Sequence, residues 1–598
     1  MRTAGDEPGD VEGAPGAPRL ARGELSPAQR GDSLHRMATE QFDVLVVGGG
    51  VVGAGCALDA VSRGLTVALV EARDWASGTS SRSSKLIHGG LRYLEMLDFG
   101  LVREALIERG LMLQRLAPHL VRPVRFMYPL TRHWERPYVG AGLALYDTLN
   151  AGAGWGRGLP HHRHLSKRRA LREFPSLRDD ALVGAVEYWD AQVDDARHTM
   201  LLVRTAAAYG ARVANRAQVT EMVKEGGRVV GAVVRDLESG GDLAVRARQV
   251  INATGVWTDE TQALAGERGR IHVRAAKGVH LVVPRDRIRG ESGLILRTEK
   301  SVLFVIPWGR HWIIGTTDTD WHLDLAHPAA SAADIDYVLG HVNRVLRIGL
   351  TPEDIEGVYA GLRPLLSGEP APDGDAQATS KLSREHMVAT QVPGLVVVAG
   401  GKYTTYRVMA ADAVDAAVHG LNRQVPPSCT DRLPLLGAEG YPALVNNLEH
   451  LASSSGLHSE RVVHLLHRYG SLSVDLLEMI AERPELAEPL PGADDYLTAE
   501  VVYAVCAEGA RHLPDVLVRR TRISFEGTDR GVSTARRAAA LMAPLLGWDD
   551  DRAAREVELY VGRVEAELRA EKAADDQAAE ATRLGAPEVV PTVTLAGS

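Results

Sequence analysis

Residues 48–53 read Gly-Gly-Gly-Val-Val-Gly and have the spacing of a loop that binds the pyrophosphate of a dinucleotide. In such a loop Gly48 makes a tight turn, Gly50 lets the phosphates approach the backbone, and Gly53 lets a helix pack closely on a strand. The phosphates then lie on the amide groups at the positive end of the helix. Glu71 follows Gly53 by 18 residues, where a carboxylate can bind the hydroxyls of a ribose. The pattern therefore predicts a dinucleotide site.

The elements that must hold this site come in the expected order along the chain. Residues 44–47 (Val-Leu-Val-Val) are a continuous apolar run, which is typical of a strand buried on both faces. A helix rich in small residues follows the glycines, and a second strand at 66–70 ends at Glu71. Much later, a third strand ends in Ala253 and Gly255, which we expect to contact the same cofactor.

The βαβ unit alone is compatible with FAD or NAD, and the later strand at 250–255, far away in sequence, distinguishes between them. A substrate region inserted between two halves of one nucleotide domain resembles the glutathione-reductase-like flavoprotein fold. The sequence therefore favours FAD.

The composition excludes several other classes of protein. A chain of 598 residues is long enough for two or more domains. Its net charge of −9 gives no overall positive field, so no binding of nucleic acid is expected. Cys56, Cys429 and Cys506 form no CxxC pair and no HExxH spacing occurs, so neither a disulfide framework nor a metal site is predicted. No segment resembles a membrane span, which needs about 20 apolar residues.

Four regions are predicted along the chain. Residues 1–40 are rich in Gly, Pro, Ala and acidic residues and are expected to be a disordered tail. Residues 41–430 alternate β-rich runs with helical patterns and are expected to form a discontinuous FAD-binding and substrate domain. Residues 431–570 have helical spacing and predict an all-helical domain, and residues 571–598 predict a frayed or disordered tail. The clearest strands lie at 245–252, 278–283 and 303–315, the last as a hairpin with its turn at 308–310.

Residues 79–93 (TSSRSSKLIHGGLRY) resemble the signature of FAD-dependent, respiratory glycerol-3-phosphate dehydrogenases. Further segments resemble the same family, in the family's order: 305–310 with 315–318, 360–365, 400–407 and 507–522. The similarity spans about residues 42–560. It implies an α/β fold: a Rossmann-like FAD-binding domain of glutathione-reductase type, an inserted antiparallel-sheet substrate domain and a C-terminal all-helical domain.

The resemblance also implies a reaction. The family oxidises sn-glycerol 3-phosphate to dihydroxyacetone phosphate by hydride transfer from C2 to N5 of FAD and passes the electrons to membrane quinone. The hydroxyl-rich segment at 79–85 would hydrogen-bond the flavin and the pyrophosphate. The cofactor-binding residues expected from the glycine loop, the third strand and the family segments are Gly48, Gly50, Gly53, Glu71, Thr79, Ser80, Ser81, Ser84, Lys85, Leu86, Ala253, Gly255 and Gly401.

A phosphorylated substrate needs a cationic pocket, because a dianionic phosphate cannot be buried unpaired. Arg92, Arg363 and Lys402 match cations of the family segments and are expected to bind the substrate, with Tyr93 as a hydrogen-bond donor. We expect Arg363 and Lys402 to act in catalysis as well. The competing interpretation of the arginines is an ordinary ion pair.

The alcohol also needs a base for its hydroxyl proton. His88 lies between the hydroxyl-rich run and Arg92 and is the first candidate. It can instead hydrogen-bond the flavin only, or be joined to it covalently. His280 is the reserve candidate, and it can equally be a strand histidine packed beneath the site.

Three alternative functions stay open. A glycerol-3-phosphate oxidase would use the same site and release peroxide from oxygen. A flavin amine or amino-acid oxidase would need one Arg for a carboxylate, so the several matched cations argue against it. A non-catalytic FAD-binding sensor would be expected to have lost His88, Arg92 or Arg363, and all three are present.

A quinone-linked enzyme without a membrane span is expected in the cytoplasm, peripherally on the inner face of the cell membrane. Two basic clusters, at 161–172 and 511–522, are candidate contacts with anionic headgroups. A solvated surface is the competing interpretation of both. The helical domain is expected to serve packing and oligomerisation, which allows a homodimer.

Overall fold

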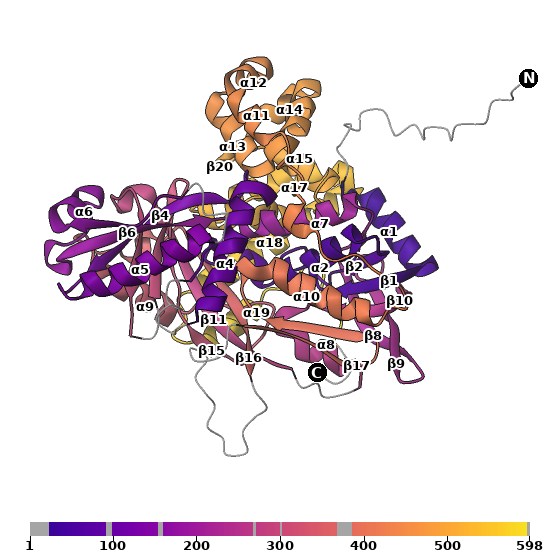
Figure 1. The fold of residues 1–598 in the computed structure, drawn as a ribbon. Coiled ribbons are helices and arrows are strands. Elements are labelled where there is room, and N and C mark those ends of the chain that lie inside the picture. Colours follow the sequence, from indigo (N-terminus) through magenta and orange to yellow (C-terminus); the bar gives the residue numbers. More distant parts are fainter. Residues whose placement is uncertain are drawn as a thin grey trace, which may run out of the picture.

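A computed structural model describes residues 23–90, 98–152, 159–266, 271–299, 302–367 and 385–594. The chain forms two large sheets that lie beside each other, and the helices of residues 441–482 project above them (Figure 1). The sheet that contains β1, β2 and β10 lies on the right in this view, and the sheet that contains β4 and β6 lies on the left. The cavity that holds the predicted dinucleotide site lies between the two sheets.

The first sheet has eight strands within the described residues. Its centre is parallel, in the order β18, β10, β1, β2, β7. The carboxyl ends of these strands meet at one edge, where doubly wound sheets bind their ligands. The strands are β1 Gln41–Val47, β2 Val67–Val70, β7 Arg212–Ala214, β8 Ala217–Glu225, β9 Arg228–Asp236, β10 Asp242–Asn252, β17 His386–Val392 and β18 Leu395–Gly400.

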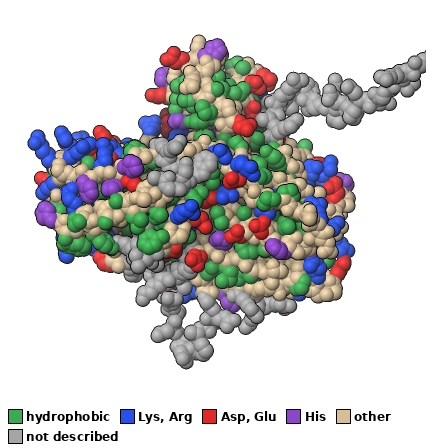
Figure 2. All heavy atoms as spheres, in the orientation of Figure 1, with side chains coloured by type: hydrophobic (Ala, Val, Ile, Leu, Met, Phe, Trp, Pro, Cys, Tyr) green, Lys and Arg blue, Asp and Glu red, His purple; other side chains and the backbone are tan. Residues whose placement is uncertain are grey.

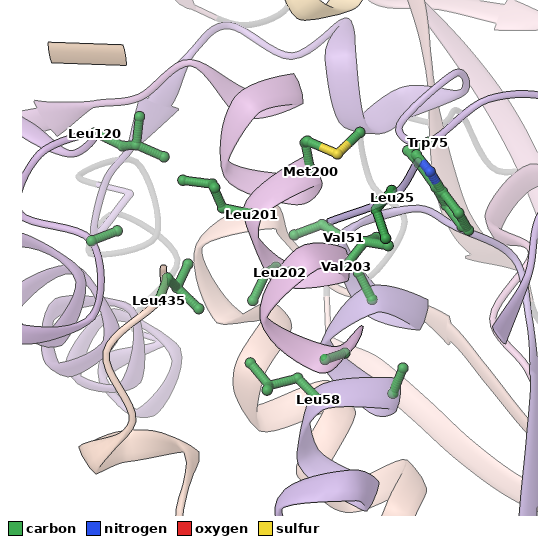
Figure 3. Close-up of a cluster of buried hydrophobic side chains, with 14 of the residues drawn as sticks. Leu25, Val51, Leu58, Trp75, Leu120, Met200, Leu201, Leu202, Val203 and Leu435 are labelled. Atoms are coloured by element: carbon green, nitrogen blue, oxygen red, sulfur yellow. The ribbon is translucent and has the colours of Figure 1, made fainter. Parts of the chain in front are cut away.

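Helices cover one face of this sheet: α2 Val51–Ser62, α7 Asp195–Ala208 and α10 Tyr406–His419. Figure 3 shows Leu202 and Val203 of α7 beside Val51 and Leu58 of α2. Alternate residues of β1 face opposite layers, so Val44 joins this core and Leu45 joins the core of the other face. This explains why the strand is apolar throughout.

The expected disordered tail at 1–40 is wrong for residues 27–39, which form helix α1 Pro27–Thr39. Ser26 caps this helix by accepting a hydrogen bond from the amide of Gln29, and proline begins it. Met37 is fully buried in the core of the first sheet. This helix has few apolar residues, and the polar and small residues around it dominate the composition of 1–40. Composition alone therefore does not indicate the helix. Residues 1–22 lie outside the described part of the chain.

The second sheet contains ten strands in the part of the chain that the structure describes, nearly all antiparallel. The predicted hairpin at 303–315 is confirmed, with its turn at 309–310. The long strand β11 pairs with β14, β15 and β16 and carries the predicted strand at 278–283. The strands are β3 Leu86–Ile87, β4 Arg122–Leu130, β5 Arg163–Ser166, β6 Gly184–Gln192, β11 His272–Pro284, β12 Gly293–Arg297, β13 Val302–Trp308, β14 His311–Gly315, β15 Thr319–Trp321 and β16 Gly357–Ser367.

Helices flank both sheets between these strands. They are α4 Phe99–Leu111, α5 Glu135–Gly152, α6 Lys167–Glu173, α8 Thr258–Ala263 and α9 Ala332–Asn343. No helix within the described ranges is long and apolar enough to cross a membrane.

The region after residue 430 is mostly helical and includes one small ribbon, β19 Pro489–Leu490 with β20 Ala493–Leu497. Its helices are α11 Tyr441–Asn446, α12 Leu448–Ser455, α13 Ser459–Tyr469, α14 Ser473–Glu482, α15 Thr498–Cys506, α16 Ile523–Glu526, α17 Val532–Leu546 and α18 Asp550–Ala570.

The expected frayed or disordered end at 571–598 is wrong for a further helix, α19 Asp576–Leu584. Ala579 of this helix is fully buried against Ala329. Residues 585–594 continue from it to the first sheet, where the backbone of Val593 hydrogen-bonds the side chain of Gln218. Residues 595–598 lie outside the described part.

Candidate active site

A cavity of about 1240 Å³ opens at the carboxyl edge of the first sheet and extends to the second sheet. The predicted site residues that line it are Gly48, Gly50, Glu71, Thr79, Ser80, Ser84, Leu86, His88, Ala253, Gly255, Arg363, Gly401 and Lys402. These residues are far apart in sequence, so the fold brings most of the predicted site together.

The glycine loop at 48–50 forms one wall of the cavity, between β1 and α2. Gly48 has a φ of +108°, which favours glycine, and its amide donates to the carbonyl of Val70 at 2.9 Å. A Cβ on Gly53 would lie 1.9 Å from the carbonyl oxygen of Gly48, so only glycine lets α2 begin this close to the strand. Gly50 caps α2 without a side chain. The loop therefore presents backbone amides and a helix N-terminus to an anion.

Glu71 directly follows β2 and lines the cavity beside the glycine loop. Its carboxylate accepts hydrogen bonds from the amides of Gly49 and Arg73, each at 2.7 Å. Burial raises the pKa of the Glu71 carboxyl. A carboxylate offers about four acceptor positions, so these two bonds fix its orientation and leave capacity for ribose hydroxyls.

The third strand, β10, ends beside the glycine loop. Asn252 accepts hydrogen bonds from the amide and hydroxyl of Thr254, at 3.2 and 2.7 Å, and so holds the turn that carries Ala253 and Gly255. Gly255 has a φ of +61°, and a Cβ added to it would meet nothing within 4 Å, so its backbone faces open space. Gly401, after β18, also has a positive φ of +75°.

The hydroxyl-rich segment crosses from the first sheet to the second. Ser80 accepts a hydrogen bond from the amide of Val51 at 2.9 Å, and Thr79 donates to the carbonyl of Leu362 at 2.6 Å. Ser81 is absent from the cavity wall, and its carbonyl accepts from the Lys85 ammonium at 2.6 Å. The segment is therefore fixed from both sides of the cavity.

The expectation that the Lys85 side chain binds the cofactor is wrong. Its Nζ is fully buried and lies 2.6 Å from Oδ1 of Asp195, away from the cavity wall. The other Asp195 oxygen accepts from the amide and hydroxyl of Ser83, at 2.9 and 2.7 Å. Arg522 of the helical region donates to Oδ1 of Asp195 at 2.8 Å. Lys85 thus ties the cofactor segment to α7 and to the helical region.

Arg363 projects from β16 into the cavity. Its guanidinium donates to the hydroxyl of Thr316 at 3.0 Å, to the carbonyl of Thr317 at 3.1 Å and to Asp318 at 3.2 Å. A Cβ on Gly278 would lie 2.6 Å from one guanidinium nitrogen, so glycine on β11 makes room for it. These contacts fix the plane of the cation while its side chain stays 25% exposed.

His280 lies on β11 at the floor of the cavity and is 2% exposed. Its Nε2 is 2.8 Å from the hydroxyl of Ser84, and its ring stacks on Tyr359 with centroids 4.7 Å apart. Burial, with further contributions from Arg363 and Lys85, holds the pKa of His280 well below its ordinary value. His280 is therefore neutral near pH 7 and belongs to the site.

His88 and Lys402 line the same cavity. The His88 ring faces Phe304 edge-on at 6.2 Å, and its amide donates to the hydroxyl of Thr404 at 3.3 Å. Lys402 begins the turn that carries Thr404. The predicted substrate residues Arg92 and Tyr93 lie outside the described residues.

Sequence reasoning missed two parts of the site. The first part is a pair of carboxylates: Asp318 orients Arg363, and Asp195 orients Lys85. The only sequence signal for Asp318 is its place in the family segment 315–318. Thr592, Val593 and Thr594 line the cavity although they belong to the expected C-terminal tail. Within the described chain, no cluster of His, Cys, Asp and Glu could hold a metal ion.

The two basic clusters have different surroundings. Most of the cluster at 161–172 is exposed, and Figure 2 shows Lys and Arg side chains gathered at the end of the molecule where Figure 1 places α6. The cluster at 511–522 is wrong as a membrane contact, because its arginines are largely buried. Arg520 lies 2.6 Å from Asp74, and Arg522 lies 2.8 Å from Asp195.

The glycine loop, the ribose carboxylate and the position of the cavity fit a dinucleotide that extends from the first sheet to the second. The family model of FAD-dependent oxidoreductases matches residues 43–407, and a model for the C-terminal domain of alpha-glycerophosphate oxidase matches residues 428–553. The chain is therefore an FAD-dependent oxidoreductase, and its fold is the flavoprotein fold expected from the sequence.

Relatives define the family within this class. The chain is 59% identical to glycerol-3-phosphate dehydrogenase 2 of Mycobacterium tuberculosis over 96% of this chain and 97% of that protein. It is 58% identical to glycerol-3-phosphate dehydrogenase of Mycobacterium leprae over 94% and 95%. The crystal structure of glycerol-3-phosphate dehydrogenase from Bacillus halodurans complexed with FAD matches 92% of this chain and 99% of its own, with 29% identity and a TM-score of 0.74. The chain belongs to the glycerol-3-phosphate dehydrogenase family.

Proposed function

We propose that this protein oxidises sn-glycerol 3-phosphate to dihydroxyacetone phosphate and passes the electrons to a membrane quinone. The observation that carries the proposal is one cavity that joins the dinucleotide cradle to two cations and two histidines, Arg363, Lys402, His88 and His280. The mycobacterial relatives, named as glycerol-3-phosphate dehydrogenases, support the choice of substrate.

Arg363 and Lys402 would bind the phosphate of the substrate. Arginine matches phosphate with two parallel N–H donors, and lysine adds a mobile point charge. Asp318 and the hydroxyl of Thr316 hold the guanidinium in one plane before substrate arrives, so little side-chain freedom is lost on binding. With its phosphate bound by these two cations, glycerol 3-phosphate would hold its C2 carbon at a fixed distance from the cofactor.

FAD, when bound in this cradle, would accept the hydrogen and the two electrons from C2. The chain must supply the base that takes the hydroxyl proton. We propose His88 for this step, since it lines the cavity beside the cations. His280, neutral and hydrogen-bonded to Ser84, would orient the hydroxyl-rich segment at 79–85. It is also the alternative base.

A quinone dissolves only in the bilayer, so a quinone-linked enzyme must rest on a membrane surface. Helices α4 and α5 line the cavity through Phe99, Tyr138 and Leu145, whose side chains are 42%, 52% and 37% exposed. Such aromatic and apolar side chains suit the membrane interface. We propose that this face of α4 and α5 meets the membrane and that quinone enters beside it.

The basic segment at 161–172 contacts α5. Asp147 of α5 accepts a hydrogen bond from the amide of His162 at 2.9 Å, and Arg136 of α5 donates to the carbonyl of Leu165 at 2.9 Å. Lys167, Arg168 and Arg172 are exposed. Exposed cations beside α5 would bind an anionic leaflet, each with about 1 kcal/mol. This arrangement supports peripheral contact with the cytoplasmic leaflet.

An oxidase that transfers the electrons to oxygen is the second candidate, and the match of residues 428–553 to the C-terminal domain of alpha-glycerophosphate oxidase favours it. The test is a stopped-flow experiment on the FAD-loaded protein. Glycerol 3-phosphate should bleach the flavin anaerobically, and glycerol should do so far more slowly. Reoxidation should then be faster with a quinone analogue in vesicles than with oxygen. Rapid stoichiometric peroxide would instead establish the oxidase, and no bleaching would contradict both.

A further inference from the structure

Residues 585–594, which we call the C-terminal strap, return from α19 to the cavity. Thr592, Val593 and Thr594 line it together with Glu71 and Gln218. This is the part of the cavity that holds the ribose carboxylate, whereas Arg363 lines it from β16 of the second sheet. The strap lies beyond residues 43–407 and 428–553, which the two family models match. Neither family model therefore assigns it a role.

The tip of the strap is held to β8 by a two-point hydrogen bond. The side-chain amide of Gln218 donates to the carbonyl of Val593 at 2.8 Å, and the amide of Val593 donates to Oε1 of Gln218 at 2.7 Å. The Gln218 residue is 7% exposed, so this side chain is fixed rather than mobile. Arg73, two residues after Glu71, donates to the hydroxyl of Thr592 at 3.4 Å. The strap is thus joined to β8 and to the segment that follows β2.

The middle of the strap is held by a hydrogen bond between the Glu588 carboxylate and His327. Glu588 pairs with the Nε2 of His327, and Arg583 lies 3.2 Å from the other ring nitrogen. The Glu588 side chain is 25% exposed and that of His327 is 18% exposed. Charge-assisted contacts of partly buried groups are stronger than ordinary surface pairs. This pair fixes the path of the strap before it reaches Gln218.

The helix before the strap is anchored more deeply. Lys277 of β11 is fully buried and pairs with Asp576 at 2.5 Å and with Asp334 at 2.5 Å. Ser331 also donates to Asp576 at 3.0 Å. Because α19 is fixed to the second sheet, the strap spans from one sheet to the other across the ribose end of the cavity.

We propose that the C-terminal strap is part of the FAD site, where it covers the adenosine half of the cofactor and slows its release. Three observations support this. The strap lines the cavity beside the carboxylate suited to ribose, it is held by side chains next to that carboxylate, and its own helix is anchored elsewhere. The strap can therefore open at Gln218 and Glu588 while the rest of the fold stays intact. Burial of the adenosine against it would remove apolar surface from water.

The test measures FAD release, without substrate, from the full-length holoenzyme, so it does not depend on the reaction proposed above. FAD is diluted out and its fluorescence is followed as it leaves the protein. Gln218→Ala and Glu588→Gln should each raise the release rate about tenfold, and the double variant should exceed either one. Glu565→Gln is the matched control, because Glu565 is 60% exposed and pairs only across one helical turn with Arg569, at 3.6 Å. Its release rate should stay within twofold of wild type.

A second readout separates a role in cofactor retention from a general loss of stability. The thermal midpoint of the apoenzyme should be unchanged in Gln218→Ala and Glu588→Gln, while the midpoint of the holoenzyme falls at limiting FAD. A chain ended at Gly585 should release FAD at least a hundredfold faster if it folds. If it does not fold, the point variants decide. Release rates within twofold of wild type in both point variants would overturn the proposal.

Discussion

The Nζ atom of Lys85 lies 2.6 Å from Oδ1 of Asp195, and both side chains are fully buried. The pair joins the segment that borders the flavin position to the start of α7. Arg522 donates to the same oxygen at 2.8 Å, so one carboxylate serves a cation from the cofactor segment and a cation from the helical region. The helical region therefore contributes to the shape of the site. It does so indirectly, because none of the described cations of 511–522 lines the cavity.

The buried ammonium predicts a specific dependence of stability on pH. Burial lowers the pKa of Lys85 to about 8 from its ordinary value of 10.5. Between these values the unfolded chain binds the proton and the folded chain does not, so the stability of wild type rises as pH increases from about 8 to 10.5. Lys85→Met keeps the Asp195–Arg522 pair and should lose this rise, which amounts to about 3 kcal/mol at most. Thermal midpoints of both proteins across about pH 7.5–10.5 measure it. Parallel curves would contradict the assignment.

The glycine loop gives a second prediction, on cofactor binding. Gly53→Ala would place a Cβ 1.9 Å from the carbonyl of Gly48, so the loop must move and the anion site distorts. We expect a loss of FAD affinity of at least tenfold, measured by fluorescence titration of the apoenzyme. Gly562→Ala, on α18 with nothing within 4 Å of the added Cβ, is the control and should bind FAD normally and gain about 0.5–1 kcal/mol of stability. Equal FAD affinities in the two variants would be inconsistent with a close-packed loop.

Much of the fold and of this loop could be predicted from the sequence, because the patterns that indicate them are local. A four-residue apolar run, the glycine spacing and Glu71 lie within 28 residues of one another, so one short segment contains the whole pattern. The family segments then located Arg363, Lys402 and His88. The confirmed hairpin at 303–315 likewise needs only its own two strands and turn.

The rest could not be predicted because it depends on pairs that are distant in sequence. Lys85 belongs to a polar segment that favours a cofactor contact, and nothing in its neighbourhood reveals Asp195 or Arg522. The arginines of 511–522 look like an exposed basic cluster in sequence, and only their buried acids, such as Asp74, show otherwise. The strap has an ordinary composition, and its role depends on Gln218, more than 350 positions earlier.

Arg363 gives a third prediction, on the substrate. Arg363→Lys keeps the charge and loses the planar fork that contacts Thr316 and Asp318. The catalytic efficiency kcat/KM with glycerol 3-phosphate should fall by roughly ten- to a hundredfold, as expected for loss of a charge-assisted contact. Arg310→Lys, at a hairpin turn with a side chain 77% exposed, should leave kcat/KM unchanged. The turnover of glycerol should respond little to either variant. A normal kcat/KM in Arg363→Ala would remove this residue from the phosphate pocket.

The two histidines of the cavity predict different pH dependences of flavin reduction. His280 is held neutral by burial, which keeps its pKa well below the ordinary value, so as base it would add no rise in rate between about pH 5.5 and 8. A histidine that must lose its own proton before it can act as the base makes flavin reduction rise with pH. We expect this rise in wild type and in His280→Asn, and a flat, slower profile in His88→Asn. Single-turnover flavin reduction by glycerol 3-phosphate measures all three. A rise that survives in His88→Asn would exclude His88 as the base.

The last prediction concerns the membrane. Lys167, Arg168 and Arg172 are exposed on α6, in the basic segment that contacts α5, and neutralising them to Gln should weaken binding to anionic vesicles. At about 1 kcal/mol for each cation the loss is about a hundredfold in the dissociation constant, and it should shrink as salt rises because the attraction is screened. The control replaces Arg536, Arg555 and Arg569, three exposed arginines of the helical region, in the same way. Vesicle co-sedimentation at low and high salt compares the two triple variants. Equal losses of vesicle binding in the two triple variants would show that only net charge matters. A loss confined to the α6 variant would place the membrane at α5 and α6. In that case its anaerobic flavin reduction should be unchanged and its turnover with quinone in vesicles should be slower.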